Sequence, residues 1–160
     1  IQFQYPTVDL STISQGVCPG DDVQFTNLSD GIGISSIWDF GDGTQSVNEN
    51  PLHNFTSNGI YDISLNIVDS FGCGSSLLIP NYINVLKPLA NFSTTGLSSN
   101  CPPLISNFGN QSSSDVTNWT WDFNDGGAST IADPSHLFTF SGVFDVSLIV
   151  ENAFGCKDTL

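Results

Sequence analysis

The feature of this 160-residue chain that most constrains its fold is an internal repeat. At an offset of 83 residues, the sequence aligns with itself without a gap from a Cys-Pro pair to a Phe-Gly-Cys triplet. These landmarks are Cys18-Pro19 and Phe71-Gly72-Cys73 in the first copy, and Cys101-Pro102 and Phe154-Gly155-Cys156 in the second. A repeat of this length that occurs twice predicts two domains in series, which we place at residues 1–86 and 87–160.

The two copies share aromatic, acidic and histidine positions between these landmarks. In each copy a Trp-Asp-Phe triplet is followed by an Asp-Gly turn and then by a lone histidine. The aligned positions are Trp38, Asp39, Asp42 and His53 in the first copy, and Trp121, Asp122, Asp125 and His136 in the second. We interpret them as a structural signature of the repeat.

The hydrophobic period within each copy is two residues, which indicates half-buried strands. Apolar side chains recur at alternate positions in residues 61–67 and 144–150. Further strands are predicted at 23–27, 37–40, 78–85 and 119–123, with a weaker one around Phe108. Gly- and Asn-rich turns separate these segments, and no segment has a helical period. The chain is therefore predicted to be all-β, with two antiparallel sandwiches.

The four cysteines indicate a covalent constraint. Cys18 and Cys73 are 55 residues apart, and so are Cys101 and Cys156. Four cysteines allow three pairings, but duplicated domains favour one disulfide within each copy, Cys18–Cys73 and Cys101–Cys156. Such disulfides imply an oxidising, extracellular compartment, whereas the alternative of four buried thiols implies the cytosol. No Cys-x-x-Cys spacing, typical of metal sites, is present.

The charge of the chain limits its partners. Sixteen acidic residues face two basic ones, Lys87 and Lys157, which gives a net charge of −14. This charge repels nucleic-acid phosphates and anionic membrane surfaces, so nucleic acid is not an expected partner. No run of about 18 apolar residues is present, so direct membrane insertion is not expected. The acidity serves solubility or cation binding, and charge alone does not separate the two.

The shared motifs resemble the signature of PKD (polycystic-kidney-disease) domains. The first copy carries it as Trp38-Asp39-Phe40-Gly41-Asp42-Gly43, Asn50-Pro51-x-His53-x-Phe55 and Gly59-x-Tyr61-Asp62. The second copy carries it as Trp121-Asp122-Phe123-Asn124-Asp125-Gly126, Asp133-Pro134-x-His136-x-Phe138 and Gly142-x-Phe144-Asp145, with Asn124 as a departure from the glycine that is usual in the family. The resemblance implies an immunoglobulin-like sandwich for each copy, with Asn124 affecting the turn and not the fold.

The resemblance also implies a function. PKD domains are typically extracellular and often occur in tandem, so the chain is expected to be a non-catalytic spacer or adhesion module of a secreted or cell-surface protein. The Cys-Pro and Phe-Gly-Cys flanks resemble repeats in Bacteroidota adhesins linked to gliding motility and type IX secretion. The expected partners are proteins or glycans at the cell surface and neighbouring modules of the same chain. The alternative is an ancillary region that supports the catalytic domain of a secreted protease or polysaccharide-degrading enzyme.

The two histidines are expected to serve the fold and not catalysis. A packing position repeats in every copy, whereas a catalytic base is rarely duplicated in two adjacent small domains. Each imidazole is expected to hydrogen-bond backbone near the Trp-Asp-Phe strand. No nucleophile motif or pair of general acid and base accompanies His53 or His136, so no catalytic residue is predicted.

The acidic residues raise the question of a cation site. Asp39, Asp42, Asp122 and Asp125 suit Asp-Gly turns, a role that is favoured over metal ligation. Because some PKD domains bind Ca²⁺, Asp21-Asp22 or Asp69 could supply oxygen ligands in the first copy, although EF-hand spacing is absent. No metal ligand is assigned.

The two copies differ at a tryptophan and at a strand. Trp38 and Trp121 are predicted to anchor the cores, and the additional Trp119 caps the core or lines a contact surface. Residues 78–85 are predicted to close the first sandwich, and the second copy has no equivalent segment. The second sandwich is therefore expected to expose an unpaired edge or to take a strand from elsewhere.

Overall fold

The computed structural model describes residues 5–31, 33–96 and 102–160 and separates into two compact units. Module 1 comprises residues 1–86 and module 2 comprises residues 87–160. All regular structure in the described residues is β-strand, which confirms the all-β prediction. Within these residues there is no helix long and apolar enough to cross a membrane.

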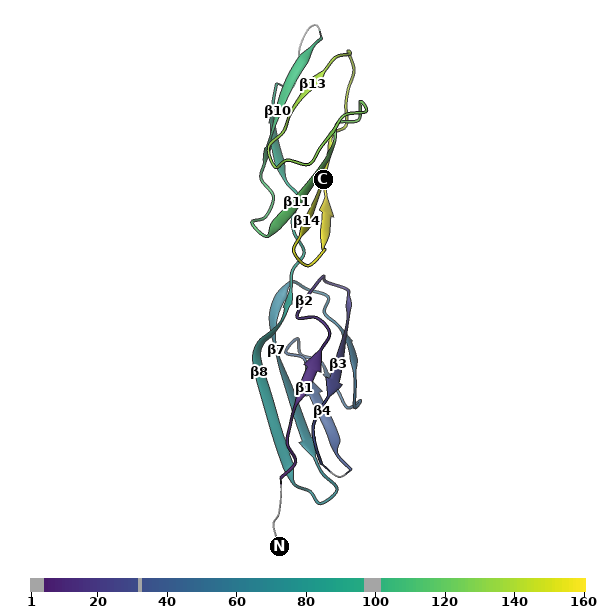
Figure 1. Ribbon diagram of the computed structural model, residues 1–160, viewed down its shortest axis with the longest axis vertical. Coiled ribbons are helices and arrows are strands. Elements are labelled where there is room, and N and C mark those ends of the chain that lie inside the picture. Colours follow the sequence, from purple (N-terminus) through teal and green to yellow (C-terminus); the bar gives the residue numbers. More distant parts are fainter. Residues whose placement is uncertain (1–4, 32, 97–101) are drawn as a thin grey trace. The chain divides into compact units, whose positions relative to one another are not determined.

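Module 1 consists of two sheets. A three-stranded sheet has the order β1-β3-β6, and a five-stranded sheet has the order β2-β8-β7-β4-β5, with β3 and β8 on opposite sides in Figure 1. Among the described residues of this module, the strand pairs are antiparallel except β2 with β8. The strands are β1 (Leu10–Thr12), β2 (Gly16–Val17), β3 (Asp22–Asn27), β4 (Ser35–Asp39), β5 (Gln45–Ser46), β6 (Leu52–Asn54), β7 (Gly59–Val68) and β8 (Gly74–Val85).

Module 2 repeats this plan, but two of its strands, β14 and β15, are shorter than their counterparts β7 and β8. Its two sheets have the orders β13-β10-β9 and β12-β11-β14-β15, and every pair is antiparallel. The strands are β9 (Phe92–Thr95), β10 (Leu104–Asn110), β11 (Val116–Asp122), β12 (Ala128–Ser129), β13 (Ser135–Phe138), β14 (Ser147–Asn152) and β15 (Lys157–Thr159). Residues 97–101, where a counterpart of β2 would fall, lie outside the described part of the chain.

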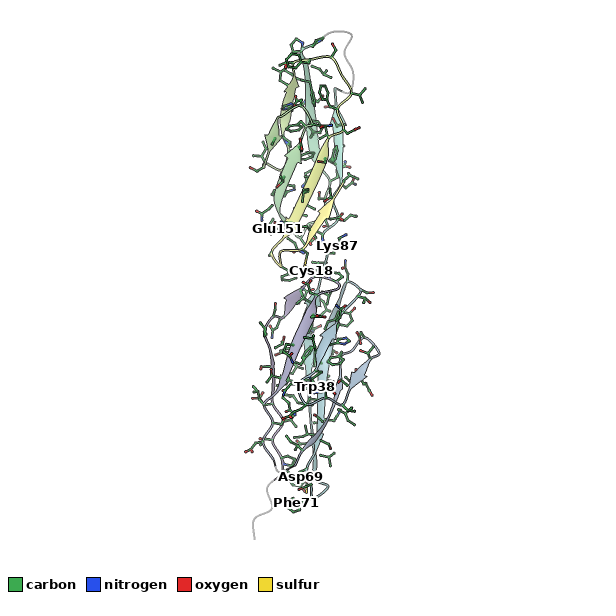
Figure 2. The ribbon with its side chains drawn as sticks, turned by 90° about the vertical axis from the view of Figure 1, so that its right-hand side faces the viewer. Cys18, Trp38, Asp69, Phe71, Lys87 and Glu151 are labelled. Atoms are coloured by element: carbon green, nitrogen blue, oxygen red, sulfur yellow. The ribbon has the colours of Figure 1, made fainter. Side chains whose placement is uncertain are left out.

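Alternation along the strands places one face of each sheet in a shared core. In β7, for example, the side chains of Ile63, Leu65 and Ile67 are buried. Trp38 lies within module 1 (Figure 2) and is 0% exposed, and its ring centroid is 5.7 Å from that of Phe25. Burial of one large apolar side chain stabilises a fold by about 1.5–3 kcal/mol, so these central rings contribute strongly.

One predicted strand is shorter than expected. The prediction of a strand over 144–150 is wrong for residues 144–146, because β14 begins at Ser147. In module 1 the matching residues of β7 pair with the second half of β8, including Tyr61 with Ile83. Module 2 pairs β14 only with β11 and β15, so no described segment offers backbone partners to residues 144–146. An alternating side-chain pattern does not form a strand by itself, because the backbone N–H and C=O groups also need hydrogen-bond partners on a neighbouring strand.

The two central tryptophans generate a matched prediction, because their indole N–H groups differ. The Trp121 N–H donates to the carbonyl of Ile131 at 3.0 Å, whereas the Trp38 N–H has no hydrogen-bond partner among the described residues. W121F leaves a carbonyl without its donor, while W38F removes an N–H that is already unpaired. We expect W121F to lower the unfolding free energy of its module by about 1 kcal/mol more than W38F lowers that of module 1.

Urea unfolding followed by hydrogen–deuterium exchange of peptides from each module measures both changes in one sample. Equal losses in the two variants would show that the indole hydrogen bond makes no net contribution.

Candidate functional site: a repeated histidine–aspartate pair

The strongest candidate site is the Asp-Gly turn that follows β4, together with the histidine on β6. The turn is built by its two aspartates: Asp39 Oδ1 accepts the Gly41 N–H at 2.9 Å, and Asp42 Oδ1 accepts the Thr44 N–H at 3.0 Å. Short carboxylates suit such turns because they accept backbone N–H groups two residues ahead. The turn belongs to the five-stranded sheet, whereas β6 belongs to the three-stranded sheet.

His53 joins these two sheets. Its Nε2 lies 2.7 Å from Asp42 Oδ2, and its ring stacks on Phe40 with centroids 3.9 Å apart and an interplanar angle of 4°. Phe55 meets the imidazole edge-on at 4.6 Å. The His53 and Asp42 side chains are only 14% and 18% exposed, so the pair is largely shielded from water.

Module 2 reproduces the same arrangement. His136 Nε2 lies 2.8 Å from Asp125 Oδ2, and the imidazole stacks on Phe123 at 4.0 Å and 9°. Asp122 Oδ1 accepts the Asn124 N–H at 2.8 Å, and Asp125 Oδ1 accepts the Gly127 N–H at 2.9 Å. Asn124 has a φ of 58°, close to the 73° of Gly41, and asparagine tolerates this left-handed conformation. The departure from glycine therefore leaves the turn intact.

The hydrogen bonds stabilise the charged aspartates. Burial alone would raise the pKa of Asp42, but hydrogen bonds from Thr44 and His53 outweigh it and hold that pKa below its ordinary value. The hydrogen bond from His136 and the Gly127 N–H lower the pKa of Asp125 in the same way. Both aspartates are thus anionic acceptors at neutral pH.

The prediction that each imidazole hydrogen-bonds backbone is wrong. The partner of the ring is the carboxylate of Asp42 or Asp125, because the turn directs the second carboxylate oxygen toward the facing sheet. The aspartate and the histidine are 11 residues apart in both copies, but every aligned pair keeps its separation in a repeat without gaps, so the spacing did not identify them as partners.

The Asp42–His53 pair does not form a nucleophilic triad. Thr44 Oγ1 lies 2.6 Å from Asp42 Oδ1 and 3.4 Å from His53 Nε2. A triad histidine uses one nitrogen for the nucleophile and the other for the acid, whereas Nε2 here faces both Thr44 and Asp42. The residue that matches Thr44 in module 2 is Gly127, which has no hydroxyl. The repeated geometry supports packing and turn formation.

The predicted core tryptophans lie in the two cores. Trp38 and Trp121 are fully buried, and Trp119 is partly buried and packs against the core of module 2. Of the two roles considered for Trp119 from the sequence, its packing agrees with capping of the core.

The acidic residues considered as Ca²⁺ ligands do not converge. Asp21 Oδ2 accepts the Cys18 N–H at 3.2 Å, whereas Asp69 lies at the opposite end of module 1 in Figure 2. Asp69 Oδ1 instead accepts the N–H groups of Phe71 and Cys73. In the part of the chain that the structure describes, no three His, Cys, Asp or Glu side chains cluster as metal ligands.

The predicted Cys18–Cys73 disulfide is wrong, because Cys73 is a free cysteine while Cys18 is disulfide-bonded. Cys73 directly precedes β8, and Cys18 directly follows Val17, which pairs with Val85 at the other end of β8. The twelve residues of β8 span roughly 40 Å at about 3.3 Å each. A disulfide tolerates only about 4.4–6.8 Å between Cα atoms. Cys156 is also disulfide-bonded, and Cys101 lies outside the described residues.

Both lysines are used in ion pairs within module 2. Lys87 Nζ lies 2.8 Å from Asp158 Oδ1, and Lys157 Nζ lies 3.3 Å from Glu151 Oε2. The hydrogen bond from Lys87 and the Ala90 N–H lower the pKa of Asp158. Each lysine is thus paired with an acidic side chain of its own module.

The shielded carboxylate of Asp42 generates a pH-dependent prediction. A lowered folded-state pKa stabilises the fold above the ordinary Asp pKa of about 3.9, and this stabilisation disappears as pH falls through the lower folded pKa. We expect D42N to lower the unfolding free energy of module 1 by about 1 kcal/mol at pH 7, with a smaller difference from wild type at pH 3. Urea titrations at both pH values measure this, with the exposed residue in E49Q as the control. A D42N variant that behaves like E49Q would contradict the role of the pair.

The chain is similar in sequence to PKD domains. The sequence model of the PKD domain matches residues 4–85 and 87–160. A microbial collagenase of Vibrio alginolyticus is 46% identical over 39 residues, and collagenase ColA of Bacillus cereus is 39% identical over 56 residues. These matches cover 24% and 32% of this chain but only 5% and 6% of the collagenases.

A solved structure, the PKD1 domain of Vibrio anguillarum Epp, is 27% identical and covers 53% of this chain and 100% of that domain, with a TM-score of 0.45. Since the family model covers nearly the whole chain in two tandem matches, the chain belongs to the PKD domain family and contains two such domains in series.

Proposed function

We propose that the two PKD domains form a non-catalytic spacer and adhesion region of a larger secreted or cell-surface protein. The observation that supports this proposal is that the two signature histidines make the same contacts in both copies. His53 and His136 are held by an aspartate and two aromatic rings of their own module. A histidine in such a contact set joins the two sheets of its module.

An extracellular location is supported by the disulfide chemistry and by the charge. Cys18 and Cys156 are disulfide-bonded, and disulfides persist mainly in oxidising compartments. The net charge of −14 favours solubility and disfavours anionic surfaces as partners. We infer that the partners are proteins or glycans at the cell surface, together with neighbouring modules. A finer hypothesis, from the flanking motifs alone, is an adhesin of gliding or type IX secretion.

A second candidate function rests on the similarity to two collagenases. In that case the modules would support a catalytic domain elsewhere in the same protein, by holding it on an insoluble substrate. The chain itself would still be non-catalytic. The two candidate functions therefore differ in which ligand the modules bind, and neither includes a reaction catalysed by the chain.

Co-sedimentation of the purified chain separates these candidates. The chain is incubated with fibrillar collagen, with an insoluble polysaccharide and with cells, and the bound fraction and any released amines or reducing sugars are measured. We expect no hydrolysis of any substrate. Retention on cells without retention on collagen would support the spacer and adhesion role, whereas retention on collagen would favour the ancillary role.

D42N, which alters the repeated pair, is the matched control for catalysis. Hydrolysis by the wild-type chain that D42N abolishes would overturn the non-catalytic assignment for the site.

A further inference from the structure

The free thiol of module 1 belongs to Cys73, which lies in a turn closed by hydrogen bonds to Asp69. Asp69 Oδ1 accepts the N–H groups of Phe71 and Cys73 at 2.9 and 2.8 Å, and the Asp69 N–H donates to the Cys73 carbonyl at 3.0 Å. Gly72 supplies a φ of 84°, which closes the turn. The backbone of Cys73 is thereby fixed at the end of the β7–β8 hairpin, and the residue is partly exposed.

Module 2 contains the same turn with its cysteine in a disulfide. Asn152 Oδ1 accepts the N–H groups of Phe154 and Cys156 at 3.0 and 3.1 Å, and Gly155 has a φ of 83°. Cys156 is disulfide-bonded and 2% exposed, whereas Cys73 is free. The neighbouring phenylalanines also differ in exposure: Phe71 is 77% exposed, whereas Phe154 is 39% exposed. The turn that holds Cys73 in module 1 is therefore the same turn that holds a disulfide-bonded cysteine in module 2.

The partner of Cys73 must come from outside module 1. The other cysteine of the module, Cys18, lies at the opposite end of the sandwich from Asp69 and Phe71 (Figure 2), which shortly precede Cys73 in the chain. Cys18 is disulfide-bonded although Cys73 is free, so the two cysteines of module 1 are not partners of one another.

From these contacts we propose that Cys73 forms a disulfide with the Cys-Pro cysteine of another PKD module. One disulfide-forming cysteine at each end lets a module be linked covalently at both ends. In this scheme the cysteines of the repeat are connectors between modules and do not staple the individual sandwich.

The reaction is a thiol–disulfide exchange with a low-molecular-weight disulfide as oxidant. The Cys73 thiolate attacks one sulfur of oxidised glutathione, which forms a mixed disulfide and releases one glutathione thiolate. The thiolate of the second module then attacks the Cys73 sulfur and releases the second glutathione. Two cysteine thiols are oxidised to one disulfide, and one glutathione disulfide is reduced to two thiols.

The test uses the complete 160-residue chain in a buffer of reduced and oxidised glutathione, with a second copy of the chain as the partner. Non-reducing electrophoresis and peptide mapping after alkylation identify the products. We expect covalent oligomers in which the Cys73 peptide is joined to a Cys-Pro peptide of a second copy, and a several-fold loss of these oligomers in C73S.

The matched control is C73S/S57C, which moves the thiol to an exposed loop residue of the same module. We expect this variant to form no more oligomer than C73S. The proposal is overturned if Cys73 is mapped to Cys18 within a monomer, if Cys73 stays fully alkylatable in the presence of oxidised glutathione, or if the S57C thiol forms oligomers as well as Cys73 does.

Discussion

The bond between the histidine and the aspartate of the Asp-Gly turn is the interaction on which each sandwich depends. It connects a turn in one sheet to a strand in the other, and Phe40 or Phe123 covers one face of the imidazole. The aspartate can serve both purposes because one carboxylate oxygen shapes the turn and the other reaches the ring. The core continues from this point, since Phe40 contacts Phe25, which in turn contacts Trp38. A polar contact shielded in this way stabilises more than an exposed ion pair, which contributes little.

The repeat and the two-residue period predicted most of the fold, because they reflect local chemistry that every strand of a half-buried sheet must satisfy. Three predictions failed where the outcome depended on distant segments. Residues 144–146 have the alternation of a strand but lack backbone partners. The equal spacing of the cysteines did not reveal that β8 separates Cys18 from Cys73 by its full length. The predicted hydrogen-bond partner of the histidine was wrong, because the Asp-Gly turn sets the direction in which the aspartate carboxylate points.

The positions that differ between the two copies are informative about function because the shared positions serve the fold. Thr44 faces the pair in module 1, while module 2 has Gly127 there. Module 2 adds Trp119 against its core, where module 1 has the buried Ser36. The free Cys73 and the bonded Cys156 occupy equivalent turns. Differences of this kind change what a module presents at its surface and ends while the sandwich stays the same.

The most direct test of this account is a double-mutant cycle between Asp42 and His53. The unfolding free energy of module 1 is measured in urea for wild type, D42N, H53Q and the double variant, and the coupling energy is taken from the four values. If the pair connects the two sheets, the coupling is on the order of 1 kcal/mol, and D42N costs little once His53 is replaced. A coupling energy of zero, with additive losses, would show that the two side chains act separately and would contradict the account.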